Sequence, residues 1–228
     1  MSESDAVQES VRLASLRSHE ILDTPPDGTF DRLTALAARI FGTRIALVSL
    51  VDEDRIWFKS RHGLDTEELP RDPGLCASAM FSPGTYVIRD ALSDPRALAN
   101  PLVAGYSGLR FYAAAPLVTH EGHRLGTLNV IDFEPRSFTV DDEHTLAQLA
   151  GAVMDQMELR ISSRRAVQSL SKLIRHSVQQ DDEGGLDTRG MTTICSWTKS
   201  VLVDGEWMTF EKAIGDLGLE PAQDPPSR

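Results

Sequence analysis

Asn129 is the polar residue whose position most needs a chemical explanation. It lies between Leu128 and Val130 in a run of alternating residues that is typical of a central β-strand. A buried side-chain amide needs hydrogen-bond partners, which come either from the protein or from a ligand. The sequence therefore makes Asn129 a candidate binding residue and leaves both origins open.

The cysteines and histidines have spacings that disfavour metal and disulfide chemistry. Cys76 and Cys195 are the two cysteines of the chain and lie far apart, so neither a disulfide framework nor a cysteine zinc site is expected. We find no metal-ligand spacing among His62, His120, His123 and His144. His120 and His123 share a turn, and exposure there is the simplest expectation for both. We expect no catalytic residue and no metal site.

His176 ends a segment, residues 170–176, that resembles a phosphoacceptor helix. No nucleotide-binding kinase sequence follows it. We therefore expect a solvated histidine on a helix, without autophosphorylation by this chain alone.

Composition indicates a globular protein with an acidic surface. The chain has 228 residues, 41% hydrophobic and 25% charged, with a net charge of -11. This length suits one domain with appendages, or two small domains, and the acidic balance disfavours nucleic acid and anionic membranes as partners. The N-terminus lacks a signal-peptide pattern and no long apolar run occurs, so a cytoplasmic protein is expected.

A β-hairpin over residues 109–132 is expected to position Asn129. Its arms alternate in period two and are joined by a polar turn at residues 119–123 that contains Gly122. Both faces are largely apolar or small, which predicts a hairpin in the middle of a sheet. Proline usually marks an edge or a bulge, so an irregularity is expected at Pro116.

Further helices and strands are expected around this hairpin. The apolar spacing predicts helices over residues 11–22 and 29–41, with Thr29 as a candidate N-cap and Gly42 as the C-terminal glycine. Residues 43–51 and 55–62 are strand-like, residues 75–81 suit a short helix and residues 86–88 a brief strand. Residues 90–108 form a long irregular segment, and long ordered loops are often functional.

A long helix from about residue 140 to 179 is expected after Thr139, a good N-cap. It would be roughly 60 Å long at 1.5 Å per residue, so its far end must either contact a partner chain or stay exposed to solvent. A parallel homodimer is the natural arrangement. The seam that we predict consists of Leu146, Ala150, Val153, Met157, Val167 and Ile174.

The domain boundaries that follow are these. Residues 1–22 form an N-terminal helical segment, 23–160 the main domain, and 161–180 the extension of the long helix. Residues 181–191 are a linker, 192–220 a small ββα module, and 221–228 a disordered tail.

Six stretches of the chain closely resemble bacterial GAF domains, the sensor type found upstream of histidine kinases and diguanylate cyclases. They are I-L-D-T-P-P at 21–26, F-D-R-L at 30–33, A-L-V-S-L-V-D at 46–52, W-F-K-S at 57–60, R-F-Y-A-A-A-P-L at 110–117 and G-H-R-L-G-T-L-N-V-I-D at 122–132. The resemblance implies an α+β fold, with a GAF/PAS-like central antiparallel sheet of about five to six strands flanked by helices. It also implies a small-molecule pocket under the long loop, and helices that dimerise.

The C-terminal stretches I-C-S-W-T-K at 194–199 and D-G-E-W at 204–207 resemble a short module that accompanies PAS, GAF and receiver domains. That module usually has a C-x-x-C pair and a later H-G-I-C stretch. Thr198 stands in place of the second cysteine and the later stretch is absent, so we interpret the segment as a structural remnant or a docking piece.

The pocket implied by the resemblance gives the candidate ligand-binding residues: Asn129, Tyr112, Asp90, Cys76, Met80 and Phe58. Ordinary core packing is an alternative for each of them. Bilin-binding GAF domains carry a histidine next to the anchoring cysteine, where this chain has Ala77, and haem has no support either. The GAF fold also includes a methionine sulfoxide reductase, but its mechanism uses several cysteines.

A cyclic-nucleotide site is also disfavoured. Phe138, Asp142 and Glu143 fit one half of a GAF cyclic-nucleotide signature, but the Asn-Lys half is missing. Helix capping explains these residues equally well.

We therefore expect a non-catalytic sensory protein that binds an unidentified small molecule and signals in trans through dimerising helices. The candidate partners are a second copy and a histidine kinase, receiver or cyclase. The alternatives are a dimeric scaffold with a collapsed pocket and, more weakly, an enzyme on the GAF fold.

Overall fold

The computed structural model describes residues 3–72, 75–98, 108–180, 191–195, 200–203 and 206–209, with side chains for 6–72, 75–98, 108–169 and 171. The chain divides into two compact units, Met1–Arg165 and Ala166–Arg228. None of the described helices combines the length and the apolarity needed to cross a membrane.

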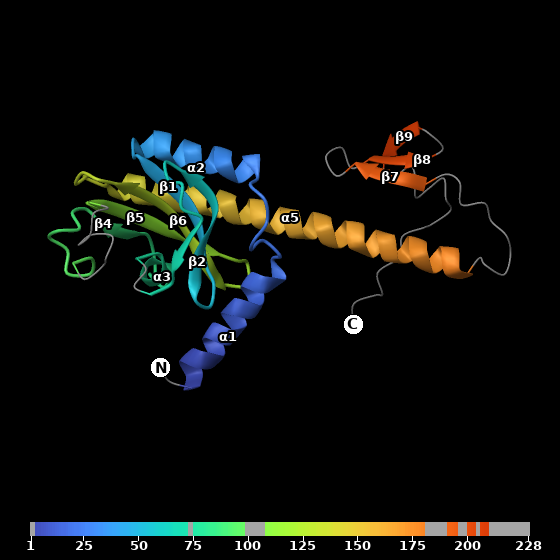
Figure 1. Cartoon of the computed structure of the whole chain (residues 1–228), viewed down its shortest axis with the longest axis horizontal. Coiled ribbons are helices and arrows are strands. Elements are labelled where there is room, and N and C mark those ends of the chain that lie inside the picture. The colour runs from blue at the N-terminus through green and yellow to red at the C-terminus, as the bar shows by residue number, and fades with distance from the viewer. Residues whose placement is uncertain are drawn as a thin grey trace. The chain divides into compact units, whose positions relative to one another are not determined.

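The first unit is built on one six-stranded antiparallel sheet with the order β3-β2-β1-β6-β5-β4 (Figure 1). The predicted α+β fold is confirmed. The central strands are β1 (Ile45–Val51), β6 (Arg124–Asp132) and β5 (Phe111–Val118), and the outer strands are β2 (Arg55–His62), β3 (Glu68–Pro70) and β4 (Tyr86–Ile88). The predicted hairpin is therefore β5–β6, in the middle of the sheet.

Helices cover both faces of this sheet (Figure 1). Helix α2 (Gly28–Phe41) and the first part of α5 (Val140–Gln180) bury side chains such as Phe30, Phe111 and Leu146 on one side, which we call the α2/α5 face. The short helix α3 (Leu75–Met80) covers the other side, the α3 face. Helix α1 (Glu3–Ser18) packs at one end of the sheet, with Leu16 in the core of the α2/α5 face.

Two sequence predictions about helix starts are corrected. Helix α1 begins at Glu3 rather than near residue 11, because acidic residues are favourable at the start of a helix and Glu9 is used in docking. Helix α2 is capped by Asp27, whose carboxylate accepts a hydrogen bond from the backbone N–H of Thr29, so Thr29 is the second helical residue and not the cap. The predicted C-terminal glycine is confirmed, since Gly42 has a left-handed φ of 62°.

Two further corrections concern strands. Residues 68–70 form the edge strand β3, which the polar and proline-bearing sequence did not predict. Pro116 lies in regular pairing with Thr127, and the irregularity falls between Leu117 and Val118. Proline fits there because β4 begins opposite Ala114 and runs away from Pro116, so β5 has one partner strand at this point.

The dimer seam predicted on α5 is wrong for four of its six residues. Leu146, Ala150, Val153 and Met157 are buried in the core of the same domain, against the sheet. An amphipathic stripe indicates that a face is covered, but not by which partner. Val167 is 41% exposed, and the side chain of Ile174 lies outside the described residues.

Close approach of β1 and β6 requires a glycine. Gly126 pairs with Leu50, and a Cβ atom on Gly126 would overlap the backbone carbonyl of the preceding residue, Ser49. The two strands are thereby held together next to Ser49 and Thr127.

The second unit contains a three-stranded antiparallel sheet of β7 (Met191–Cys195), β8 (Ser200–Val203) and β9 (Glu206–Thr209). The sequence predicted two strands here, and β7 is an addition. The linker predicted at 181–191 is one residue too long, because Met191 begins β7. Residues 181–190, Thr198, and the predicted final helix and tail at 210–228 lie outside the described residues.

Candidate functional site

A cluster of polar side chains lies buried on the α3 face. Side chains alternate along a strand, so Leu128 and Val130 of β6 point to the α2/α5 face while Thr127 and Asn129 point to the α3 face. Ser49 on β1 and Tyr112 on β5 flank them, and all four residues are at most 1% exposed. We call Ser49, Tyr112, Thr127 and Asn129 the polar cluster.

Hydrogen bonds satisfy the amide of Asn129 within the protein. The Tyr112 hydroxyl and the Thr127 hydroxyl each donate to its Oδ1 over 2.8 Å. Its Nδ2 donates to Ser49 Oγ, also over 2.8 Å, and the Ser49 and Thr127 hydroxyls lie 2.8 Å apart. The sequence left open whether the protein or a ligand supplies these partners, and in this structure the protein does.

The apolar surroundings of this cluster contain most of the predicted ligand-binding residues. Phe58, Cys76 and Met80 are each at most 8% exposed and lie in one apolar group with Tyr112. Asp90 is elsewhere: its carboxylate makes a bidentate ion pair with Arg110, at 2.8 and 2.9 Å. The fold therefore brings five of the six predicted residues together.

Both titratable groups of this site are held neutral. Burial raises the pKa of the Cys76 thiol, and it raises the pKa of the Tyr112 hydroxyl well above its ordinary value. A neutral thiol is a poor nucleophile. The site suits an apolar ligand with a few hydrogen-bonding groups better than it suits acid–base or thiolate chemistry.

Sequence reasoning missed Ser49 and Thr127. Each signal was present: Ser49 is the one hydroxyl in the apolar run of β1, and Thr127 lies two residues before Asn129, on the same face of a strand.

Sequence reasoning also missed Lys59, a buried lysine on the other side of β2. The pairing of β1 with β2 shifts at Lys59, which is the extra residue of a β-bulge and is 3% exposed. Its ammonium donates to Thr24 Oγ1 and to the Pro25 carbonyl, each over 2.8 Å, beside the rings of Phe30 and Trp57. Burial lowers the pKa of this ammonium.

A cavity of about 510 Å³ lies beside Lys59. Carboxylates and cations both line it, among them Asp23, Asp31 and Arg61. Nearby, Asp27 forms an ion pair with Arg160, which ties the start of α2 to α5. These contacts indicate a structural junction.

The remaining sequence candidates have structural roles. Thr139 and Asp142 cap α5 reciprocally, with backbone-to-side-chain hydrogen bonds of 2.8 and 3.2 Å, as the capping interpretation predicts. His120 is exposed and lies 2.7 Å from Glu158, while His123 is only partly exposed. Within the described residues no group of three or more histidine, cysteine or acidic side chains is arranged to hold a metal ion.

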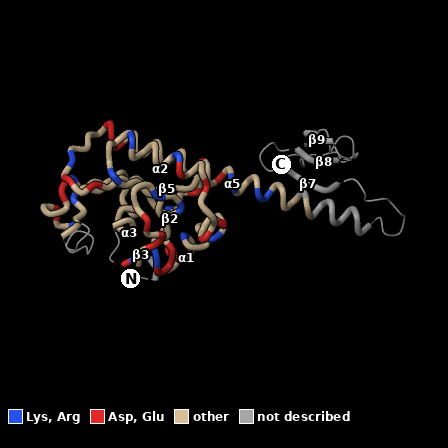
Figure 2. The backbone as a smooth tube through the Cα atoms, turned by 45° about the horizontal axis from the view of Figure 1, so that its top comes forward, with Lys and Arg blue, Asp and Glu red and all other residues tan. Residues whose placement is uncertain are grey.

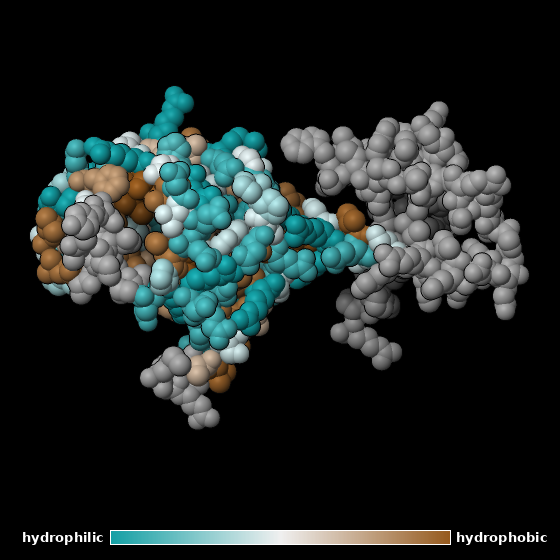
Figure 3. Space-filling model, viewed as in Figure 1, coloured by the Kyte–Doolittle hydropathy of each residue, from teal (hydrophilic) through white to brown (hydrophobic). Residues whose placement is uncertain are grey.

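Hydrophobic atoms gather on the surface around β4 and the segment that follows it (Figure 3). Leu92 and Leu98 there are 55% and 51% exposed. By contrast, acidic and basic residues lie close together around α1, β2 and β3 (Figure 2), where Arg17 pairs with Glu53 and Arg55 with Glu68.

The architecture defines the class of protein. The sequence pattern of the GAF domain family matches residues 25–157, more than half of the chain. The chain belongs to the GAF domain family, and the resemblance carried by its motifs is confirmed.

A curated relative extends this likeness. A cyclic di-GMP phosphodiesterase of Pseudomonas aeruginosa is 37% identical over 175 residues, which are 76% of this chain and 30% of that protein. The chain thus spans less than a third of the length of the relative.

Solved structures share the fold. The free methionine-R-sulfoxide reductase of Neisseria meningitidis has 23% identity and a TM-score of 0.50, covering 73% of this chain and 95% of the reductase. The GAF domain of an Acinetobacter phosphoenolpyruvate-protein phosphotransferase has 16% identity and a TM-score of 0.50, covering 69% and 95%.

Proposed function

We propose that this chain is a sensory GAF module without catalytic activity of its own, which binds a small molecule on the α3 face. The observation that carries the proposal is the polar cluster in an otherwise apolar layer. Small-molecule sites are mostly apolar with a few convergent polar groups, and Asn129, Tyr112, Ser49 and Thr127 supply such groups.

The ligand class follows from the same groups. Hydroxyl and amide groups can exchange their partners for those of a ligand without leaving a buried group unpaired. Among the described residues no charged side chain is hydrogen-bonded to the polar cluster, and Asp90 and Arg110 are paired with each other away from it. An uncharged, largely apolar ligand with one or two polar groups fits best.

The signal would be a two-state bias. A ligand shifts an equilibrium only as far as it prefers one of the two arrangements. Binding at Asn129 would re-pair the hydroxyls that join β1 to β6, and the helices packed on this sheet would pass the change on.

Signalling in trans would use a second copy of the chain and a histidine kinase, receiver or cyclase. The relative that acts on cyclic di-GMP supports an output in second-messenger signalling. Since the inner face of α5 is used by its own sheet, a homodimer would form through outward residues. Exposed apolar candidates are Leu36 and Ile40 of α2 and Leu159 of α5, each at least 45% exposed.

The absence of catalysis is supported by the state of the only thiol whose side chain is described. Cys76 is buried and held as a neutral thiol, whereas reductase chemistry needs a reactive thiolate.

Native mass spectrometry of the purified chain tests the proposal. We expect a co-purified or added small molecule to bind the parent chain, and Asn129→Leu to abolish its retention. Thr34→Val is the matched control, because it removes a buried hydroxyl from the α2/α5 face and should retain the ligand. Equal retention in both variants, or none in the parent, would contradict the sensor.

The alternative is a dimeric scaffold with a closed pocket. It is favoured by the complete pairing of Asn129 within the protein. A scaffold would retain no ligand in any variant, yet bind its kinase or receiver partner equally well with Asn129→Leu.

A further inference from the structure

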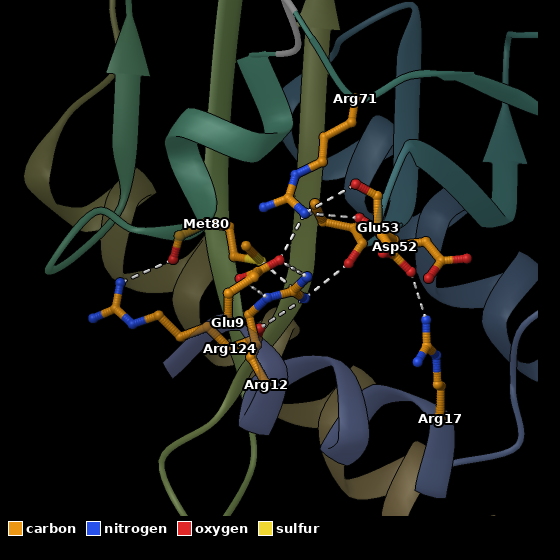
Figure 4. Close-up of polar contacts among 9 residues, drawn as sticks. Glu9, Arg12, Arg17, Asp52, Glu53, Arg71, Met80 and Arg124 are labelled. Atoms are coloured by element: carbon orange, nitrogen blue, oxygen red, sulfur yellow. Dashed lines mark hydrogen bonds and ion pairs between the residues drawn. The ribbon is translucent and has the colours of Figure 1, made fainter. Parts of the chain in front are cut away.

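A buried arginine holds the N-terminal helix to the rest of the domain (Figure 4). Arg12 of α1 is 5% exposed. Its Nη1 donates to the carbonyl oxygen of Val51, at the end of β1, over 2.8 Å, and lies 3.9 Å from the sulfur of Met80 on α3. One guanidinium thus contacts α1, the sheet and α3.

An acidic partner completes this contact. Nε and Nη2 of Arg12 donate to the two carboxylate oxygens of Glu9, over 2.8 and 2.7 Å. Arg71 donates to the same carboxylate over 2.6 Å and to the Asp52 carbonyl over 3.0 Å (Figure 4). We call Glu9, Arg12 and Arg71 the Arg12 clamp.

A second arginine holds the end of α3. Nη1 of Arg124, at the start of β6, donates to the carbonyl oxygens of Met80 (2.9 Å) and Ser82. Its own backbone carbonyl lies 3.5 Å from Nη1 of Arg12. The C-terminal end of α3 and the inner face of α1 therefore share one set of polar groups.

The clamp makes the docking of α1 cooperative. Removing one partner of a buried ion pair leaves an uncompensated charge, so such a contact is either complete or strongly unfavourable. The apolar contacts of α1 are concentrated at Leu13 and Leu16, which are buried, whereas Val7 and Val11 on the same helix are 60% and 48% exposed.

Space beside the clamp permits movement. A surface cavity of about 920 Å³ separates much of α1 from α3, with Ala6, Ser10, Ala77 and Phe81 in its walls. The contact between Arg12 and Met80 bridges the two helices near the middle of α1.

We propose that α1 is a latch on α3, with Arg12 as the positioning residue. A seated α1 holds α3, and with it Cys76, against the sheet. Displacement of α3 removes the contact between Met80 and Arg12 and releases α1. That a ligand causes this displacement rests on the proposed function; the coupling of α1 to α3 does not.

Hydrogen exchange of the full chain without any ligand tests the latch. In Arg12→Met, amide exchange in α1 should rise about tenfold or more, because Glu9 keeps only Arg71 as a partner and the Val51 carbonyl loses the guanidinium. Alkylation of Cys76 by iodoacetamide, followed by peptide mass spectrometry that separates it from Cys195, should accelerate to a similar degree.

Arg17→Met is the matched control. It is the same substitution on the same helix, but the side chains of Arg17 and Glu53 are 58% and 71% exposed. Both readouts should stay within about twofold of the parent.

Arg124→Met tests the coupling from the other end. It removes the hydrogen bonds to the Met80 and Ser82 carbonyls without touching a side chain of α1, and should still raise amide exchange in α1. Faster alkylation of Cys76 with unchanged exchange in α1 would overturn the latch.

Two further outcomes are informative. If Arg12→Met does not give a cooperative melt, Arg12→Lys keeps the charge and removes the two-pronged geometry, and should show the same changes. Exchange in α1 that matches the Arg17→Met control would also overturn the proposal. Because no ligand enters these experiments, their failure would leave the proposed function standing, and ligand retention tests that separately.

Discussion

The two faces of the six-stranded sheet bury side chains of different chemistry. On the α2/α5 face, aromatic rings pack closely: Phe138 lies 5.3 Å from Phe41 and 5.4 Å from Phe111 between ring centroids. On the α3 face, a buried amide and three hydroxyls lie among apolar side chains. Both faces come from the same strands, so one layer can be dedicated to stability while the other keeps polar groups that can exchange partners.

The polar groups that the α2/α5 face does bury are redundantly paired. Ser60 Oγ lies 2.8 Å from Thr34 Oγ1 and also donates to Asp31 over 2.7 Å. In the polar cluster, Asn129 is the common partner of Tyr112, Thr127 and Ser49. Loss of one residue should therefore disturb the two faces unequally.

The largest effect is expected on the α2/α5 face from Phe111→Ala. Phe111 is fully buried, and its removal leaves a cavity in a layer of rings, so the free energy of unfolding should fall by about 3–5 kcal/mol. Urea denaturation of the full chain measures it. Val118→Ala, on the same strand but 42% exposed, should cost less than about 0.5 kcal/mol. Equal costs would show that this face is not the main source of stability.

A smaller loss is expected on the α3 face from Asn129→Leu. The Tyr112 hydroxyl loses its acceptor while still buried, so the free energy of unfolding should fall by about 2–3 kcal/mol. Adding Tyr112→Phe should recover about 1 kcal/mol, because the unpaired hydroxyl is removed. A double variant less stable than Asn129→Leu alone would mean that the hydroxyl has another partner.

Low pH should weaken the docking of α1 on the α3 side of the domain. The hydrogen bond from Arg12 lowers the pKa of Glu9 below its ordinary value. A carboxyl with a lowered folded pKa contributes stability above its unfolded pKa, and that contribution is lost as the pH falls through the folded value. Amide protection in α1, corrected for intrinsic exchange, should decrease below about pH 4.3. Glu9→Gln should flatten this dependence, and an unchanged profile would assign it to another group.

Among the substitutions of buried residues, the smallest effect is expected from Thr34→Val. Ser60 keeps its hydrogen bond to Asp31, so no buried group is left unpaired and the free energy of unfolding should fall by about 1 kcal/mol or less. A loss as large as that of Asn129→Leu in urea denaturation would remove the contrast between the faces.

Local patterns in the sequence determined much of the fold. Period-two alternation placed the central hairpin, Gly42 and Thr139 marked helix ends, and the motifs assigned the family. Each of these signals depends on residues a few positions apart, which fix backbone geometry by themselves. The candidate binding residues came from the family resemblance, and three of the six, Phe58, Tyr112 and Asn129, lie on strands.

Tertiary structure alone decided which residues each buried face contacts. Asn129 pairs with Ser49, 80 positions earlier, and α5 turns its apolar stripe to its own sheet rather than to a second helix. The burial of Arg12 likewise depends on Val51, Met80 and Glu9 meeting in space. Periodicity shows that a side chain is covered, but the identity of its partner is set by long-range packing, which no local pattern encodes.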